Sequence, residues 1–470
     1  MKLTRHESGS LREIWSISWP MILAAMTNYF ITLADRVILS IYSKDAFVAV
    51  GFTHPFYWGN TRAMMAFISV TSVFIGKFYG ARNYRQIRKI VWQTIFIAFS
   101  YYVVLIPCAW NAKIFLADKI EDLGAPYLSI TLLFLPFHLA GFGAIGAFFL
   151  GIGLTRVVLV VILISNLINI LFDLLLVFGL YGFPELGIRG AAYATGISQL
   201  VAFFIFLYKF LGRPYRQRFL THVPGFSLRL IKKCLPLGIP NAISSILNSG
   251  GFAIVSQMIA KVCSADDALA FTIANSIYLF FWFFADGLGK GLSTICSNYI
   301  GRNEVHMIAH SFRSSAKLLL VFAGFTAIFM IINPNLTLRL FYQDEVTDLF
   351  FSNFCWMLFA AWGAVMVDAF RWMLQSILIA ADDIYFAVIS NVSCFWLAAF
   401  VPIFLFVYVL HWWGAIFCWQ CFILDSCARI ISDFCRIRSG TWKRKVLEAA
   451  QFSQMNTPSN GRRVSRRRQK

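Results

Sequence analysis

Residues 166–198 read NLINILFDLLLVFGLYGFPELGIRGAAYATGIS, and this stretch shows the features that decide the fold. Two apolar runs flank a short connection that contains glycines and a proline. Asn169 and Asp173 lie four residues apart in the first run, so in a helix both side chains project from one face. A carboxylate within such a run is expensive and marks a candidate functional residue.

The apolar character extends over the whole chain. It has 470 residues, of which 59% are hydrophobic and 13% charged, whereas an average soluble domain is about half apolar and a quarter charged. A membrane-spanning helix needs roughly 20 apolar residues. Twelve windows reach that length, starting near residues 17, 47, 91, 127, 157, 190, 235, 268, 314, 349, 384 and 414. We therefore expect an all-α polytopic membrane protein with about twelve transmembrane helices.

The positive charge is concentrated in short connections. The formal net charge is +19, and loops 80–90 and 209–233 are basic, as cytoplasmic loops are in an inner membrane. The alternate connections are acidic or mixed, as in YQDEVTD at 342–348. This pattern predicts a multi-pass inner-membrane protein with both termini cytoplasmic. It also accounts for the charge without a nucleic-acid partner. We expect the basic tail to be disordered and held near anionic lipid.

The two halves of the chain resemble each other at an offset of about 215 to 230 residues. SKDAFVAVGFTHPFYW at 43–58 resembles ADDALAFTIANSIYLFFW at 265–282, and FIGKFYGARNYRQIRK at 74–89 parallels ICSNYIGRNEVHMIAH at 295–310. Such repeats build transporter folds. We therefore predict an N-lobe at 1–208, a cytoplasmic linker at 209–233, a C-lobe at 234–435 and a tail at 436–470, with the lobes rocking for alternating access.

The sequence provides no motif for ATP use or catalysis. GLGKGLST at 287–294 lacks P-loop spacing, and HExxH and GxSxG are absent. The seven histidines are too dispersed for a metal-ligand cluster or a nucleophile with its base. We therefore expect no enzyme, no cofactor and no structural metal. His54 and His138 are expected to be packing residues, as is the CxxC pair Cys418 and Cys421.

A secondary transporter without ATP must couple to an ion, so the intramembrane ionisable residues are the candidates. Asn169 and Asp173 suit a proton or Na+, or alternatively a hydrogen bond between helices. Asp35 suits an ion site or a salt bridge with Arg62. Asp286 with Lys290, and Asp368 with Arg371, have the spacing of neutralising pairs within a helix.

The chain resembles the multidrug and toxic compound extrusion (MATE) family over roughly residues 10–435. The most specific match is 166–198, in which an Asn, an Asp four residues later and a GAAxAT ending occur together. Further matches are SWPMILA with Asp35, FYGARN, LGIGLTR, LPLGIP and YIGRNE. The resemblance implies two six-helix lobes that exchange an organic substrate for H+ or Na+. It places the ion site at Asp35, Asn169, Asp173 and Thr195.

The resemblance also indicates departures from the family. The C-lobe acidic position of sodium-coupled relatives falls on Asp368, but their acidic residue in the seventh helix falls at Asn248, which carries no charge. Arg36, Arg62, Lys290 and Arg371 are extra basic residues within spans, and two or more of them facing the cavity would repel a cationic drug.

We thus expect an ion-coupled exporter of small organic molecules, monomeric and embedded in the lipid bilayer. The alternative is a flippase or exporter of the same superfamily for lipid-linked or anionic substrates, although such flippases commonly have fourteen spans.

Overall fold

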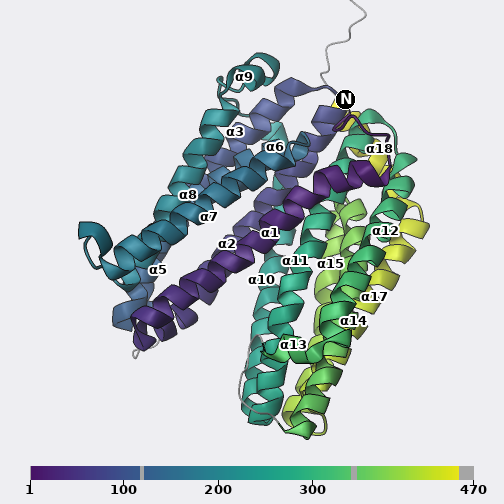
Figure 1. Cartoon of the computed structure of the whole chain (residues 1–470). Helices are drawn as coiled ribbons and strands as arrows, with labels where there is room; N and C mark the ends of the chain where they lie inside the picture. The colour runs from purple at the N-terminus through teal and green to yellow at the C-terminus, as the bar shows by residue number, and fades with distance from the viewer. Residues whose placement is uncertain (1, 117–120, 340–346, 455–470) are drawn as a thin grey trace, which may run out of the picture.

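The computed structural model describes residues 2–116, 121–339 and 347–454, and within these ranges the regular elements are all helical (Figure 1). Those of the first half are α1 (Leu11–Tyr42), α2 (Lys44–Gly80), α3 (Tyr84–Ser100), α4 (Tyr102–Trp110), η1 (Ala112–Phe115), α5 (Glu121–His138), η2 (Leu139–Ile145), α6 (Gly146–Gly151), α7 (Thr155–Phe178), η3 (Leu180–Gly182), α8 (Ile188–Phe210) and α9 (Arg213–Phe219). Those of the second half are α10 (Leu228–Val262), α11 (Ala265–Arg302), α12 (Met307–Ala327), η4 (Ile328–Ile332), α13 (Pro334–Arg339), α14 (Asp348–Ala380), α15 (Ile384–Cys394), η5 (Phe395–Phe400), α16 (Val401–Ile403), η6 (Phe404–Val409), α17 (Ala415–Arg438) and α18 (Thr441–Gln454).

Twelve helical segments of the described chain are long and apolar enough to cross a membrane, which confirms the expected number. Six precede α9 and six follow it, so α1, α2, α7 and α8 have counterparts in α10, α11, α15 to η6, and α17. The internal repeat is visible at the helix starts. Ser43 caps α2 by accepting a hydrogen bond from the Ala46 amide, and Ser264 caps α11 by accepting one from the Asp267 amide.

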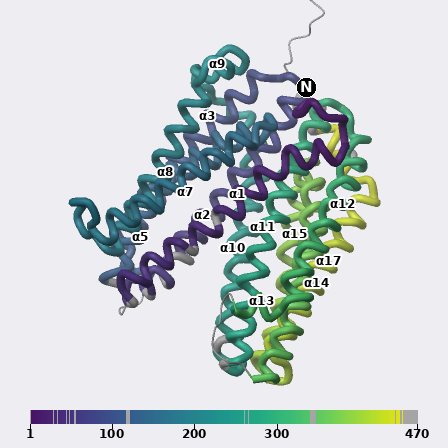
Figure 2. Tube along the Cα trace, in the orientation of Figure 1, coloured from purple at the N-terminus to yellow at the C-terminus, as the bar shows by residue number. Residues whose placement is uncertain are grey.

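The first helix of each lobe packs partly into the core of the other lobe. The first half of α1 contributes Ile14, Ile17 and Ile22 to the hydrophobic core of the C-lobe. The start of α10 contributes Leu230 and Leu237 to the core of the N-lobe. Figure 2 shows α1 running from the C-lobe side to the far end of the N-lobe. A displacement of α1 therefore acts on both lobes.

One end of the molecule, which we call the basic end, carries the N-terminal segment, α9 with Arg213, Arg216 and Arg218, and α18. The helices of the two lobes lie close together there and diverge toward the opposite, far end (Figure 1). Contacts between the lobes at the basic end include an ion pair of 2.6 Å between Lys77 of α2 and Asp382. Near the N-terminus, the Ser314 hydroxyl donates to the Gly9 carbonyl at 2.7 Å.

Glycines allow α2 and α11 to approach backbone to backbone at the basic end. A Cβ atom on Gly80 would collide with the carbonyl oxygen of Asn298, and one on Gly301 with that of Lys77. Gly76 lies against the side chain of Ser297, whose Cβ would be 2.9 Å from a Cβ added at Gly76. Since four glycine or serine positions keep this contact narrow, larger side chains here would push the lobes apart.

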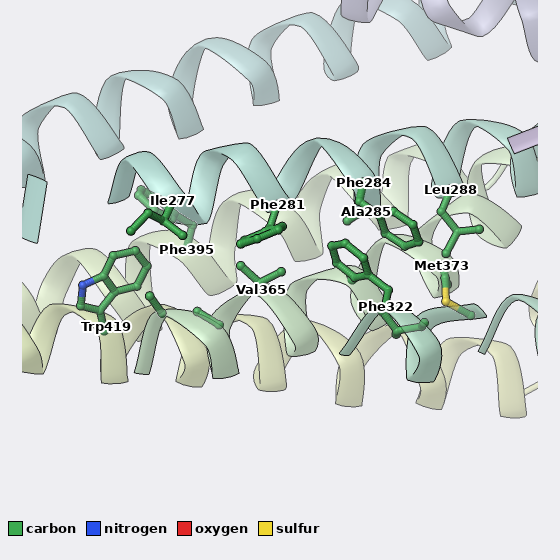
Figure 3. Packing of buried hydrophobic residues seen from close by; sticks show 14 of the residues in the cluster. Ile277, Phe281, Phe284, Ala285, Leu288, Phe322, Val365, Met373, Phe395 and Trp419 are labelled. Carbon is green, nitrogen blue, oxygen red and sulfur yellow. The ribbon is translucent and has the colours of Figure 1, made fainter. Parts of the chain in front are cut away.

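Aromatic side chains fill the C-lobe core between α11, α12, α14 and α17 (Figure 3). Phe284 of α11 stacks on Phe322 of α12 with ring centroids 3.6 Å apart and an interplanar angle of 5°. Trp419 of α17 is fully buried and packs on Phe271 and Tyr278 of α11. This core makes the C-lobe a solid body against which the N-lobe can move.

The sequence-based expectation of a disordered tail is wrong for residues 436–454. α17 continues to Arg438, and α18 packs on the basic end, with Trp442 and Val446 buried in the C-lobe core. Buried Asp383 accepts hydrogen bonds from Arg436 at 2.8 Å and from Lys445 at 2.7 Å. These apolar and ionic contacts offset the conformational entropy that the segment loses when it becomes ordered. The GRRVSRRRQK stretch lies outside the described residues.

We expect Gly301→Ala to weaken the basic-end contact, because the added methyl group meets the backbone of α2. The cost is about 1–3 kcal/mol of overpacking. It should appear as a lower melting temperature in detergent and as faster maleimide labelling of a Thr294→Cys reporter in a cysteine-free background, because Thr294 is buried on α11 beside Gly76 and cysteine is no larger than threonine. Gly324→Ala on α12 is the matched control, because a Cβ there meets open space. Equal melting and labelling in both variants would refute the role of the close contact.

The docking of α18 should depend on pH through Asp383. Burial raises the pKa of Asp383, but the hydrogen bonds from Arg436 and Lys445 outweigh burial and leave the pKa below its ordinary value. The stabilisation is therefore complete above the usual aspartate pKa of about 4 and is lost as the pH falls below that value through the lowered pKa.

Lys445→Met should remove one partner of Asp383 and raise the mobility of a nitroxide at Gln451 at neutral pH. Arg444→Met is the control on the same helix, because Arg444 is exposed and lies 3.8 Å from Glu448. The Asp383 interaction contributes nothing if both variants behave as wild type.

Candidate functional site

The predicted N-lobe ion residues meet between α1, α7 and α8. The Asp173 carboxyl of α7 lies next to the Asp35 carboxyl of α1, close enough for the two groups to share a hydrogen bond. The Asn169 amide donates to Oδ2 of Asp173 at 3.2 Å, as expected from their spacing of four residues. Both Asn169 and Asp173 are buried. Two carboxyl groups at this separation repel each other when both are charged, and a proton on one of them would let it donate a hydrogen bond to the other.

A small cavity of about 20 Å³ opens beside this pair. Asp35, Thr195 of α8 and Tyr127 of α5 line it, together with Thr32, Arg36, Leu39, Val50 and Ala191. This volume is sufficient for one water molecule. Asp35, Asn169, Asp173 and Thr195 therefore occupy one neighbourhood, where a water or an ion can reach the carboxyl pair.

The small residues of the sequence 186–198 bring α7 and α8 together. A Cβ on Gly190 would collide with the carbonyl of Leu176, so only glycine allows the start of α8 to lie against the end of α7. Gly187 has a φ of 53° and precedes α8 at the turn. The GAAxAT ending thus has a packing role, since it places Thr195 close to the carboxyl pair.

The carboxyl pair can take up a further proton. Oδ1 of Asp35 and Oδ1 of Asp173 are buried and have no other hydrogen-bond partner within the described part of the chain. Unsatisfied buried acceptors are costly, and a second proton would remove the remaining negative charge from the pair. The arrangement therefore suits reversible protonation.

The C-lobe contains a second polar group of residues around Asp368 of α14. Oδ1 of Asp368 accepts from Nε of Arg371 at 2.7 Å and from Ser426 at 3.3 Å, and Oδ2 accepts from the Trp282 indole at 2.7 Å. This confirms the expected pair of Asp368 and Arg371. Because the guanidinium already neutralises this carboxylate, Asp368 has little need of a metal cation.

Asn248 belongs to a separate network in the C-lobe. Its amide approaches Ser244 at 3.4 Å, and Ser244 also accepts from Asn391 at 3.1 Å. Asn391 in turn accepts from Arg429, which forms a bidentate pair with Asp425. Asp425 and Arg429 were not among the residues expected from the sequence, although their spacing of four residues within an apolar run was a visible signal.

The other intramembrane basic residues differ in their surroundings. Lys290 pairs with Asp286 at 2.6 Å, as predicted, although half of its side chain is exposed. The alternative of an Asp35–Arg62 salt bridge is wrong, because Asp35 faces Asp173 and Arg62 lies over the Trp282 ring at 5.9 Å. Arg36 is exposed at the small cavity.

The structure tests the expected packing role for one of the two histidines, His138, and not for His54. His138 packs on Phe142 with ring centroids 5.0 Å apart, in agreement with a packing role. The side chain of His54 lies outside the described part of the structure.

Known proteins match most of the chain. The family model MatE matches residues 20–175 and 240–405. Over 353 residues the chain is 25% identical to the "Probable multidrug resistance protein NorM" of Thermotoga maritima. The aligned region covers 73% of this chain and 75% of that relative.

Two solved structures share the fold, each at a TM-score of 0.80, 18% identity and 94% coverage of this chain. One is an outward-facing "multidrug resistance MATE family transporter of the MOP superfamily", of which 98% is covered. The other is a MOP superfamily transporter from Pyrococcus furiosus, described by the reverse polarity of its binding pocket, of which 100% is covered.

Asp368→Asn should destabilise the C-lobe, because it leaves the buried Arg371 guanidinium without its main counter-charge. Breaking a buried pair costs about 3–5 kcal/mol. Thermal unfolding in detergent should show this loss, and adding Arg371→Gln should recover part of it. Asp286→Asn is the control, because Lys290 is half-exposed and an exposed pair contributes about 0–1 kcal/mol. Equal losses for both aspartates would contradict the assignment.

Proposed function

Because the chain belongs to the MatE family, whose members are transporters and not enzymes, we propose that it is a proton-coupled antiporter. It exports small organic molecules by alternating access between its lobes. The observation that carries the choice of proton is the close approach of the carboxyls of Asp35 and Asp173. Two carboxyl groups in contact resist being charged at the same time, so the pair favours binding a proton.

The position of Asp35 on α1 supports the coupling. The C-terminal half of α1 carries Asp35 in the N-lobe, whereas its N-terminal half packs on α11, where Ser18 lies against Gly291 and Ile22 against Gly287. A second proton abolishes the charge of the pair and changes how this half of α1 packs on α7. Since α1 belongs to both cores, this local change biases the relative position of the lobes.

The arrangement of the lobes supports export. Basic loops favour the cytoplasm, so the basic end, where the lobes meet, faces the cytoplasm and the diverging far end faces outward in the inner membrane. Both termini then lie on the cytoplasmic side. In this state substrate leaves to the outside, and protonation of the Asp35–Asp173 pair accompanies its release. The multidrug name of the Thermotoga maritima relative supports a broad range of organic substrates.

The test is dye uptake into inverted membrane vesicles, driven either by an interior-acid pH gradient or by an interior-high Na+ gradient. The probes are ethidium, rhodamine 6G and fluorescein. We expect the pH gradient to drive uptake, and Asp35→Asn and Asp173→Asn each to reduce it about tenfold or more, the size of typical coupling between sites.

Asp45→Asn is the matched control, because Asp45 is an exposed carboxylate at the start of α2. It should transport as wild type. Undiminished coupled uptake in both carboxylate variants would overturn the ion-site assignment, and uptake driven by Na+ alone would overturn the choice of proton.

A further inference from the structure

Arg62 lies on the face of α2 that is directed at the C-lobe. Gly76 and Gly80 of this helix contact α11 at the basic end. Residue 62 precedes residue 76 by about four helical turns at 3.6 residues per turn, so the two positions share one face. The Arg62 side chain is exposed on this face.

The surroundings of Arg62 on α11 are aromatic and electrically neutral. The guanidinium lies over Trp282 at 5.9 Å from the ring centroid, within cation–π range. Asp286 is close enough to attract Arg62, but its carboxylate already accepts a hydrogen bond from Lys290 at 2.6 Å. Within the described part of the chain, Arg62 therefore shares one carboxylate with a second cation.

An aromatic group of α1 and α11 continues this surface. Tyr29 lies 5.8 Å from Phe283 and 6.0 Å from Phe280 between ring centroids, and Phe30 lies 5.5 Å from Phe280. Phe30 is 55% exposed. Trp58, one turn before Arg62 on α2, is 41% exposed. We call Tyr29, Phe30, Trp58, Arg62, Trp282 and Lys290 the inter-lobe surface.

The carboxylates near this surface already interact with other side chains. Asp35 faces Asp173, and Asp368 is buried against Arg371. Arg36, two turns from Tyr29 on α1, adds another exposed cation. The described side chains therefore leave the inter-lobe surface with a positive balance, which repels a cation and attracts an anion.

We propose that the inter-lobe surface binds a flat aromatic organic anion as the transported substrate. Arg62 pairs with the anionic group as a fork of N–H donors, and Lys290 lies at the edge of the same surface. The rings of Phe30, Trp58 and Trp282 stack on the aromatic body. This inference rests on the proposed export function, because it names the substrate class of the same transporter.

Equilibrium binding separates this inference from the coupling mechanism, because it needs no ion gradient. Fluorescein and rhodamine 6G share a xanthene ring but carry opposite charges at pH 8, so fluorescence anisotropy with the purified full-length protein in neutral detergent isolates the effect of charge. We expect fluorescein to bind about tenfold or more tightly than rhodamine 6G, and Arg62→Gln to remove most of this preference, because the variant loses the charged donor that pairs with the anionic group.

The matched control is Arg313→Gln on α12, which also removes one exposed arginine and should leave both affinities unchanged. Arg62→Lys should retain part of the preference, and its melting temperature checks folding. Inorganic phosphate at the concentration of fluorescein should not displace the dye, because phosphate lacks the ring.

Three results would overturn the inference. They are tighter binding of rhodamine 6G, an Arg62→Gln variant with unchanged preference, and displacement of fluorescein by equimolar phosphate. A protein that binds fluorescein in this way but shows no pH-driven uptake would retain the binding site and lose the proposed coupling.

Discussion

The close approach of α2 and α11 is the contact on which the rest of the structure depends. Gly80 and Gly301 lie against the opposing backbones, so the two lobes meet without intervening side chains. Packing at this distance gains dispersion contacts over both helices. Because the contact is confined to the basic end, the lobes are joined at one end and free to separate at the other.

Neutralisation of charge in the membrane is the second constraint. Asp368, Asp425 and Asp286 each have a basic partner on their own helix, three or four residues away. These local pairs lower the cost of placing charges in an apolar medium. The Asp35–Asp173 pair is different, because it joins two carboxyls from two helices. A proton lowers the charge of such a pair, whereas a basic side chain neutralises each of the other aspartates. This difference is the physical basis for assigning the Asp35–Asp173 pair to proton coupling.

The two lobes have the same order of helices and different chemistry. The N-lobe places its carboxyl pair beside a small cavity at α1, α7 and α8. The C-lobe fills its interior with stacked aromatic rings and paired ions, as the Phe284–Phe322 contact and the Asp425–Arg429 pair illustrate. The repeated architecture thus combines a rigid C-lobe with an N-lobe that carries the carboxyl pair. α1 connects them, since it belongs to the core of both lobes.

The sequence by itself determined the twelve spans, the two-fold repeat, the family and the local pairs such as Asp286 with Lys290. Hydrophobic length, loop charge and a spacing of three or four residues are local properties that need no tertiary information. Only the tertiary structure decided that Asp35 faces Asp173 and not Arg62, that Arg62 meets Trp282, and that α18 docks on Asp383. These contacts join residues far apart in the chain, and which faces meet depends on how whole helices pack.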